Sequence, residues 1–158
     1  SNKTEGLDDI RDAVNAVSDK LGRRLRFLVG KPGLDGHSNG AEQIAFRARD
    51  CGMDIDYEGI RLTPEEIVKS ASEGEAHVIG LSILSGSHMP LMADLMERLR
   101  AAGLGHIPVV VGGIIPEDDA KRLLEMGVAR VYTPKDFELN TIMMDIVTLA
   151  DPKAVAAE

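Results

Sequence analysis

Asp35 and His37 are the two residues of this sequence whose types and spacing best suit chemistry. They stand in KPGLDGHSNGAEQIA, residues 31–45, which begins rich in glycine and ends as the opening of a predicted helix. A histidine with one carboxylate partner suits a single-residue metal ligand, because one ring nitrogen binds the metal while the other donates to the carboxylate. Such a metal must bring its other ligands with it, as a macrocycle does. The structural alternative is that Asp35 forms an Asx turn and His37 caps the helix.

Spacing excludes several other kinds of site. Residues 30–40 contain neither the GxxxxGK[ST] of a P-loop nor the GxGxxG of a dinucleotide-binding turn. The single cysteine, Cys51, excludes an internal disulfide and any CxxC motif. A zinc site needs three or four convergent ligands. The four histidines are instead scattered along the chain, at His37, His77, His88 and His106.

Composition limits the partners and the location. The chain has 158 residues, a formal net charge of −8 and 3% aromatic residues without tryptophan. This acidic balance argues against a nucleic acid and against an anionic membrane surface, and the scarcity of aromatic rings argues against base stacking. The longest apolar run, 107–115, is too short to span a bilayer. One cysteine and no export signal lead us to expect a cytoplasmic protein.

Hydrophobic periodicity predicts strands and helices that alternate along one domain. The predicted strands cover 24–30, 53–60, 77–84, 107–113 and 128–133. The predicted helices cover 7–21, 39–50, 63–74, 88–102, 116–126 and 138–150. Thr63, Pro64 and Glu66 predict a capping box at the start of one helix. We therefore expect an α/β fold, a flavodoxin-like five-stranded parallel sheet in the order 2-1-3-4-5 with helices on both faces.

The loops after the strands are the unusual parts of this fold. A ligand of a flavodoxin-like sheet binds beyond the carboxyl ends of the strands, at the switch point between strands 1 and 3. Four loops there are glycine-rich or hydroxylated, namely 30–40, 82–88, 112–113 and 132–137, and we expect them to form one site. A phosphoacceptor receiver domain would place an aspartate after strand 3. Ser82, Ile83 and Leu84 occupy that position, which excludes this interpretation despite Lys135.

Three motifs together resemble the cobalamin-binding domain family. They are Asp35-Gly36-His37-Ser38-Asn39-Gly40 for D-x-H-x-x-G, Ser82-Ile83-Leu84 for S-x-L, and Gly112-Gly113 for G-G. The resemblance covers about residues 24–150 and is greatest to the carboxy-terminal domain of methylmalonyl-CoA and ethylmalonyl-CoA mutases. The wording GLDGHSNGAEQIA is most similar to the ethylmalonyl-CoA mutase form.

The resemblance implies a role for each matching residue. His37 corresponds to the lower axial cobalt ligand that replaces the cofactor's own dimethylbenzimidazole, Asp35 to its hydrogen-bond partner, and Lys31 to a lysine that extends this chain. The detached nucleotide tail is expected in a slot between sheet and helix. The resemblance also implies that Ser82 bonds the buried base, that Leu84 lines its pocket, and that Gly112 and Gly113 form a flat passage for the tail. Other residues implied around the cofactor are Gly36, Gly40, Tyr132 and Thr133. Tyr132 is equally compatible with a core position and a satisfied hydroxyl.

The resemblance also implies an activity and a partner. We expect residues 24–150 to be the cobalamin-binding domain of an adenosylcobalamin-dependent acyl-CoA mutase, residues 1–23 to be an amino-terminal helix or linker, and residues 151–158 to fray. An acyl-CoA-binding β/α barrel needs about 250 residues, so this chain alone is not expected to catalyse the rearrangement. The alternatives are a non-catalytic corrinoid carrier or cobalamin-responsive regulatory domain, and a flavodoxin-like interaction domain without a cofactor.

Overall fold

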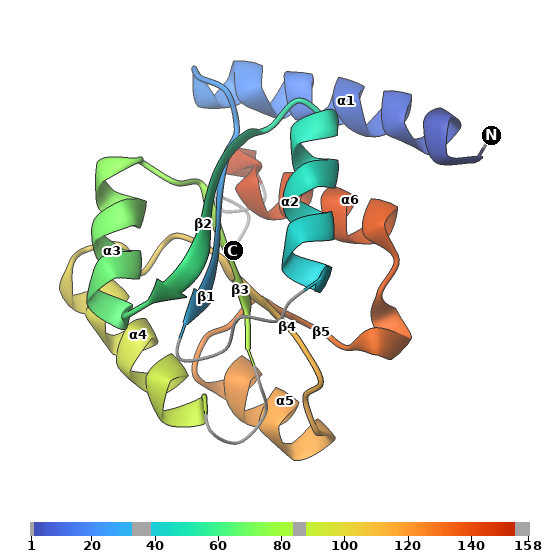
Figure 1. Cartoon of the computed structure of the whole chain (residues 1–158). Helices are drawn as coiled ribbons and strands as arrows, with labels where there is room; N and C mark the ends of the chain where they lie inside the picture. The colour runs from blue at the N-terminus through green and yellow to red at the C-terminus, as the bar shows by residue number, and fades with distance from the viewer. Residues whose placement is uncertain (1, 33–38, 84–87, 154–158) are drawn as a thin grey trace.

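The structure, a computed structural model, describes residues 2–32, 39–83 and 88–153. Strands and helices alternate through these residues and form an α/β fold, with one sheet between two layers of helices (Figure 1). The helices are α1 (Asn2–Leu21), α2 (Asn39–Asp50), α3 (Pro64–Glu73), α4 (Met89–Ala101), α5 (Glu117–Glu125) and α6 (Leu139–Ala150). The strands are β1 (Arg26–Pro32), β2 (Asp54–Leu62), β3 (Val78–Ser82), β4 (Val109–Gly112) and β5 (Arg130–Tyr132).

The five strands form a single parallel sheet in the order β2-β1-β3-β4-β5. This confirms the predicted flavodoxin-like fold. The register places Gly80 of β3 beside Val29 of β1 and Val110 of β4, so the central strands are aligned at their carboxyl ends. Each parallel connection crosses one face of the sheet through a helix, which leaves helices on both faces.

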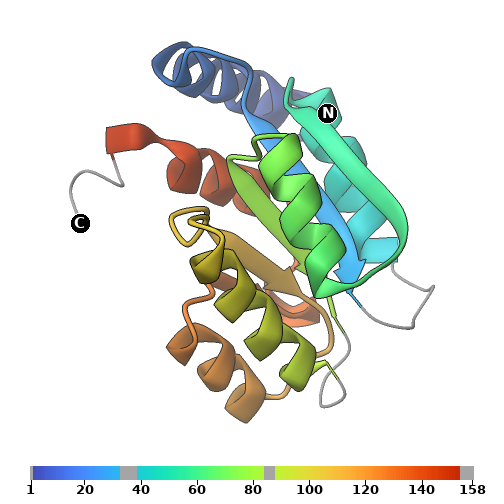
Figure 2. The same cartoon turned by 90° about the vertical axis from the view of Figure 1, so that its left-hand side faces the viewer.

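Each face of the sheet carries its own hydrophobic core. The first core, under α1, α2 and α6, contains Phe27, Val78 and Val110. The second core, under α3, α4 and α5, contains Leu28, Ile79 and Val111. Neighbouring residues of one strand belong to opposite cores because side chains alternate along a strand. Figures 1 and 2 show the two helical layers, with α3, α4 and α5 lying side by side over one face.

Local sequence explains where several elements begin. The predicted capping box is confirmed at α3, where the Thr63 hydroxyl accepts from the Glu66 amide and the Glu66 carboxylate accepts from the Thr63 amide, both at 3.1 Å. Strand β4 is shorter than predicted. It begins after Pro108, which has no amide proton to donate to the ladder. A short 3₁₀ helix, Pro134–Asp136, which was not predicted, follows β5.

The ends of the described chain pack on α6. Helix α1 begins earlier than predicted and contributes buried Ile10 and Val14 to the first core. Asp151, the residue that follows α6, forms an ion pair with Lys20 of α1 at 3.2 Å. Residues 154–158 lie outside the described residues, so fraying of the tail stays a prediction. In the part of the chain that the structure describes, no helix combines the length and apolar character needed to cross a membrane.

Candidate functional site

A cavity of about 500 Å³ lies at the carboxyl end of the sheet, on the face that α2 and α6 cover. Its volume falls within the range of roughly 300–1,000 Å³ that small-molecule sites occupy. The lining comes from β1, β3, β4 and β5, from the first turns of α2 and α6, and from the segment 132–137. Most lining side chains are apolar or absent, and the wall includes Val29, Ile44, Val110 and Ile142.

The alternation of side chains along the strands explains why the first core ends in a cavity. On β3, Val78, Gly80 and Ser82 share the face of the first core, whereas Ile79 and Leu81 belong to the second. On β4, Gly112 follows Val110 on the same face. Small residues thus replace large ones towards the carboxyl end of one face only. The second core, by contrast, is filled to the ends of these strands.

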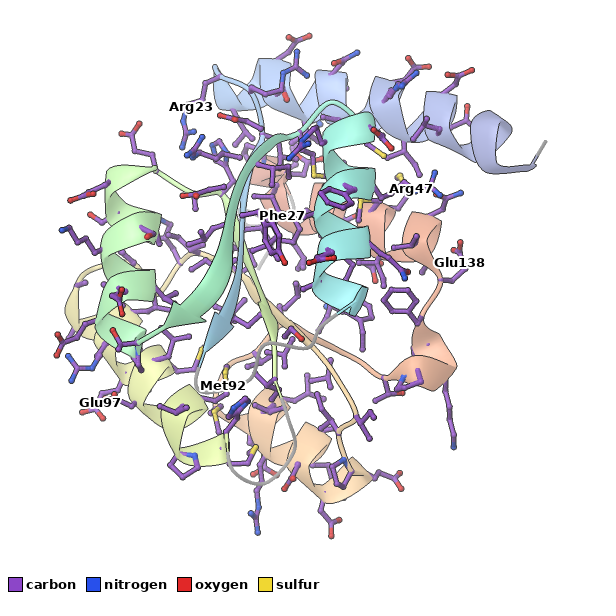
Figure 3. All side chains as sticks on the ribbon, in the orientation of Figure 1. Arg23, Phe27, Arg47, Met92, Glu97 and Glu138 are labelled. Atoms are coloured by element: carbon purple, nitrogen blue, oxygen red, sulfur yellow. The ribbon has the colours of Figure 1, made fainter. Side chains whose placement is uncertain are left out.

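Gly80 makes room for one aromatic wall of the cavity. A Cβ at this position would lie 2.6 Å from Cζ and 2.8 Å from Cε1 of Phe27. The Phe27 ring therefore occupies the space over Gly80. It has no solvent exposure and lines the cavity from β1 (Figure 3). A buried ring held by close packing forms a rigid wall.

Gly112, which ends β4, and Gly113, which follows it, are glycines for different reasons. At Gly113, where φ is +153°, a Cβ would lie 2.1 Å from the carbonyl oxygen of Ile83, so any side chain would displace backbone. At Gly112 the nearest atoms to a Cβ are the carbonyl oxygen of Tyr132 at 3.7 Å and its Cβ at 4.0 Å, which are ordinary contacts. The fold therefore needs Gly113, while the missing side chain at Gly112 keeps the cavity open.

Tyr132 forms the second aromatic wall. It is 7% exposed, its side chain lines the cavity, and its hydroxyl donates to the Asp145 carboxylate of α6 at 2.6 Å. Burial first, and then the hydrogen bond to Asp145, raise the pKa of this phenol. Tyr132 is thus a core residue with a satisfied hydroxyl that also lines the cavity, and its contact with a cofactor stays a prediction. Thr133 also lines the cavity and donates to Asp136 at 3.0 Å.

The mouth of the cavity carries exposed apolar side chains. Ile114 is 72% exposed and Phe137 is 37% exposed, and both line the cavity. Among the described residues, a Cβ at Gly40, in the first turn of α2, would meet Cε2 of Phe137 at 3.7 Å, which is an ordinary contact. Glycine is therefore not required by packing at this helical position, although it costs a helix about 1 kcal/mol relative to alanine. The part of the rim formed by Ile114 and Phe137 is consequently apolar and exposed.

The structure brings six of the predicted site residues together around this cavity: Gly40, Ser82, Gly112, Gly113, Tyr132 and Thr133. Lys31 lies at the end of β1, where its Cα pairs with that of Arg61. Asp35, Gly36, His37 and Leu84 lie outside the described residues, so their roles stay predictions. Within 2–32, 39–83 and 88–153, no three His, Cys, Asp or Glu side chains are grouped so that they could hold a metal ion.

Sequence reasoning missed several residues of the site. Gly80 interrupts the apolar strand VIGLS, and a glycine inside a strand is a known indication of close approach. Phe27 and Ile142 look like ordinary core residues in the sequence, whereas Phe137 lies in the loop 132–137 that was expected at the site but was not singled out there. Asp145 has no sequence signal, because its contact with Tyr132 joins α6 to β5 in three dimensions only.

Comparison with known proteins gives matches along the whole chain. The family model described as the B12 binding domain matches residues 25–137. The chain is 70% identical over 158 residues to an ethylmalonyl-CoA mutase of Cereibacter sphaeroides, covering 100% of this chain and 24% of that protein. It is 47% identical over 112 residues to the pivalyl-CoA mutase small subunit of Xanthobacter autotrophicus, covering 71% of this chain and 75% of that protein. The chain thus spans about a quarter of the ethylmalonyl-CoA mutase that it matches.

Solved structures agree on the fold. A cobalamin-binding protein from Desulfitobacterium hafniense superimposes with a TM-score of 0.67 at 20% identity, over 90% of this chain and 70% of that chain. A Francisella response-regulator receiver domain superimposes with a TM-score of 0.63 at 15% identity, over 82% of this chain and 99% of that chain. At these identities the similarity concerns the fold alone.

Proposed function

This chain belongs to the B12-binding domain family, and from that premise we propose that it is the cobalamin-binding part of an adenosylcobalamin-dependent acyl-CoA mutase. The observation that carries the proposal is the position of the cavity. It lies at the end of the first core, and Ser82 and the Gly112–Gly113 pair, two of the family's three motifs, line it. The third motif ends at Gly40, at its mouth.

The described residues fit a long ligand with an apolar end. In the proposed complex the detached nucleotide tail enters between Ile114 and Phe137 and lies between the sheet and α2. Gly112 and Gly40 leave space that a Cβ would take, while their own surroundings would tolerate one. Ser82 contributes a hydroxyl to a wall that is mainly apolar, and the resemblance to the family supports a hydrogen bond from it to the buried base.

His37 is proposed as the lower ligand of cobalt, with Asp35 and Lys31 extending the hydrogen-bonded chain behind it. Gly36 gives the backbone between them freedom to follow the macrocycle. Leu84, the last residue of the S-x-L motif that begins at Ser82, is proposed to line the tail's pocket. Asp35, Gly36, His37 and Leu84 lie outside the described residues, and the resemblance to the family's motifs supports the proposed roles.

The reaction itself is proposed to need a partner. In such a mutase the cofactor supplies homolysis of a cobalt–carbon bond and a carbon-skeleton rearrangement. This chain's share is to bind the tail, exclude water from it and hold the lower ligand. An acyl-CoA-binding β/α barrel, in the same polypeptide or as a separate subunit, would cover the exposed rim at Ile114. The chain alone is therefore expected to convert neither ethylmalonyl-CoA nor methylmalonyl-CoA.

Absorbance titration of the 158-residue chain with cobalamin tests the proposal. We expect the spectrum of a form in which imidazole has replaced benzimidazole, and His37→Ala should abolish this ligation. His106→Ala, which changes an exposed histidine, is the matched control and should leave the spectrum as in wild type. No spectral change with wild type at micromolar protein would refute cobalamin binding, and turnover of either acyl-CoA by the chain alone would refute the need for a partner.

A further inference from the structure

Asp145 lies on α6, outside the wall of the cavity, yet it holds part of that wall in place. It is half-buried, one helical turn after Ile142, and its Oδ2 accepts the hydroxyl proton of Tyr132 at 2.6 Å. This is the length of a hydrogen bond between a hydroxyl and a carboxylate, which is about twice as strong as a neutral one.

The position of Tyr132 explains why its ring needs such an anchor. The residue ends β5, a three-residue strand that pairs with β4 at the border of the sheet. Its carbonyl oxygen accepts the Gly113 amide at 3.0 Å, so its backbone is fixed to the glycine passage. The hydroxyl contact then ties the other end of the residue to α6. Phe27, in the middle of the sheet, is held by packing and needs no such bond.

Proton transfer is not the purpose of this pair. Burial and the adjacent carboxylate raise the pKa of the Tyr132 phenol, which therefore stays protonated and remains the donor at physiological pH. The hydroxyl also points to α6, while the ring faces the cavity. The pair is therefore suited to orienting a surface.

We propose that Asp145 is a positioning residue, which through Tyr132 fixes the plane of the aromatic wall against which the nucleotide tail binds. This inference rests on the proposed function. It makes a distinction between ligands, because the wall contacts the tail and not the corrin ring. Loss of Asp145 should weaken binding of a corrinoid that carries the tail and leave binding of a tail-less one unchanged.

The test titrates the chain with cobalamin and with cobinamide, which has no nucleotide tail. Asp145→Ala and Tyr132→Phe should each weaken cobalamin binding about tenfold or more, with cobinamide affinity within about twofold of wild type. The double variant should lose no more than either single one, because both remove the same bond. Asp145→Asn keeps an acceptor oxygen and should restore most of the affinity.

Matched measurements separate the possible failures. Glu97→Ala removes an exposed carboxylate from α4, on the opposite face of the sheet (Figure 3), and should change neither affinity. If Asp145→Ala does not fold by circular dichroism, Tyr132→Phe decides, since it keeps the ring. Equal weakening of both corrinoids, or no weakening, would overturn the role of Asp145 and leave the proposed function intact. A wild-type chain that binds neither corrinoid would overturn both.

Discussion

Replacing Gly112 and Gly113, one at a time, by alanine separates the needs of the fold from those of the ligand. At Gly112 an added Cβ would sit 3.7 Å from the nearest atom, so we expect Gly112→Ala to change the free energy of unfolding by less than about 1 kcal/mol. At Gly113 it would sit 2.1 Å from a carbonyl oxygen, on a backbone with φ of +153°. We expect Gly113→Ala to lower the free energy of unfolding by about 3 kcal/mol or more.

Gly112→Ala should affect cobalamin binding directly, although it barely changes stability. The methyl group of Gly112→Ala projects into the cavity, and overfilling a packed site costs about 1–3 kcal/mol. That corresponds to a cobalamin dissociation constant about 5- to 150-fold higher than that of wild type. The variant should thus be as stable as wild type and yet defective in binding, which separates a site residue from a structural one.

Urea unfolding followed by far-ultraviolet circular dichroism gives the stabilities, and absorbance titration gives the affinities. Wild-type affinity in Gly112→Ala would show that the tail does not pass this residue, which would contradict the assigned site. Wild-type stability in Gly113→Ala would show that the close approach to Ile83 is not a real constraint. Either result would refute the division of roles between the two glycines.

Three further changes test other parts of the structure. Gly80→Ala should lower the free energy of unfolding by about 1–3 kcal/mol, since its Cβ would lie 2.6 Å from the Phe27 ring, and adding Phe27→Leu should restore part of it in urea unfolding. Nδ1 of His77 accepts the Arg26 amide at 3.0 Å, and burial lowers the pKa of this histidine. Its contribution to stability should be complete above about pH 6.5 and be lost as the pH falls through the lower folded-state pKa. In His77→Asn, which keeps an acceptor, the midpoint of urea unfolding should depend less on pH between pH 7.5 and 5.5 than in wild type. The same dependence on pH as in wild type would contradict this. Cys51 is fully buried and burial raises the pKa of its thiol to about 11, so a disulfide reagent should label it only on unfolding, and rapid labelling of the native chain would be contrary evidence.

The sequence predicted the fold because its signals are local and repeated. Alternating periods of two and 3.6 residues gave the element order, and short parallel connections leave few topologies. The order 2-1-3-4-5 then placed Ser82 and Gly112 at one edge of the sheet, where the structure has them lining one cavity. The predicted ends of the elements were less accurate. Strand β4, for example, begins only after Pro108, which has no amide proton for the hydrogen-bond ladder.

The walls of the site could not be predicted in the same way. Which residue Tyr132 contacts depends on the rotation of α6 about its axis and on the side-chain rotamer. Neither of these produces a motif with fixed spacing in the sequence. The sequence also could not tell Gly112 from Gly113, because the difference lies in the distance to Ile83 on another strand. Likewise, Phe27 is one apolar residue among many until Gly80 is placed beneath its ring.

The alternation along β3 has a consequence for how this fold can change. Gly80 and Ser82 face the cavity, while Leu81 between them and Ile83 after them belong to the opposite core. A single residue inserted before Gly80 would exchange these two sets, so that leucine and isoleucine would fill the cavity and glycine would weaken the other core. A substitution in β3 therefore alters one face of the sheet, whereas insertions and deletions there should be tolerated only in pairs, which keep the alternation.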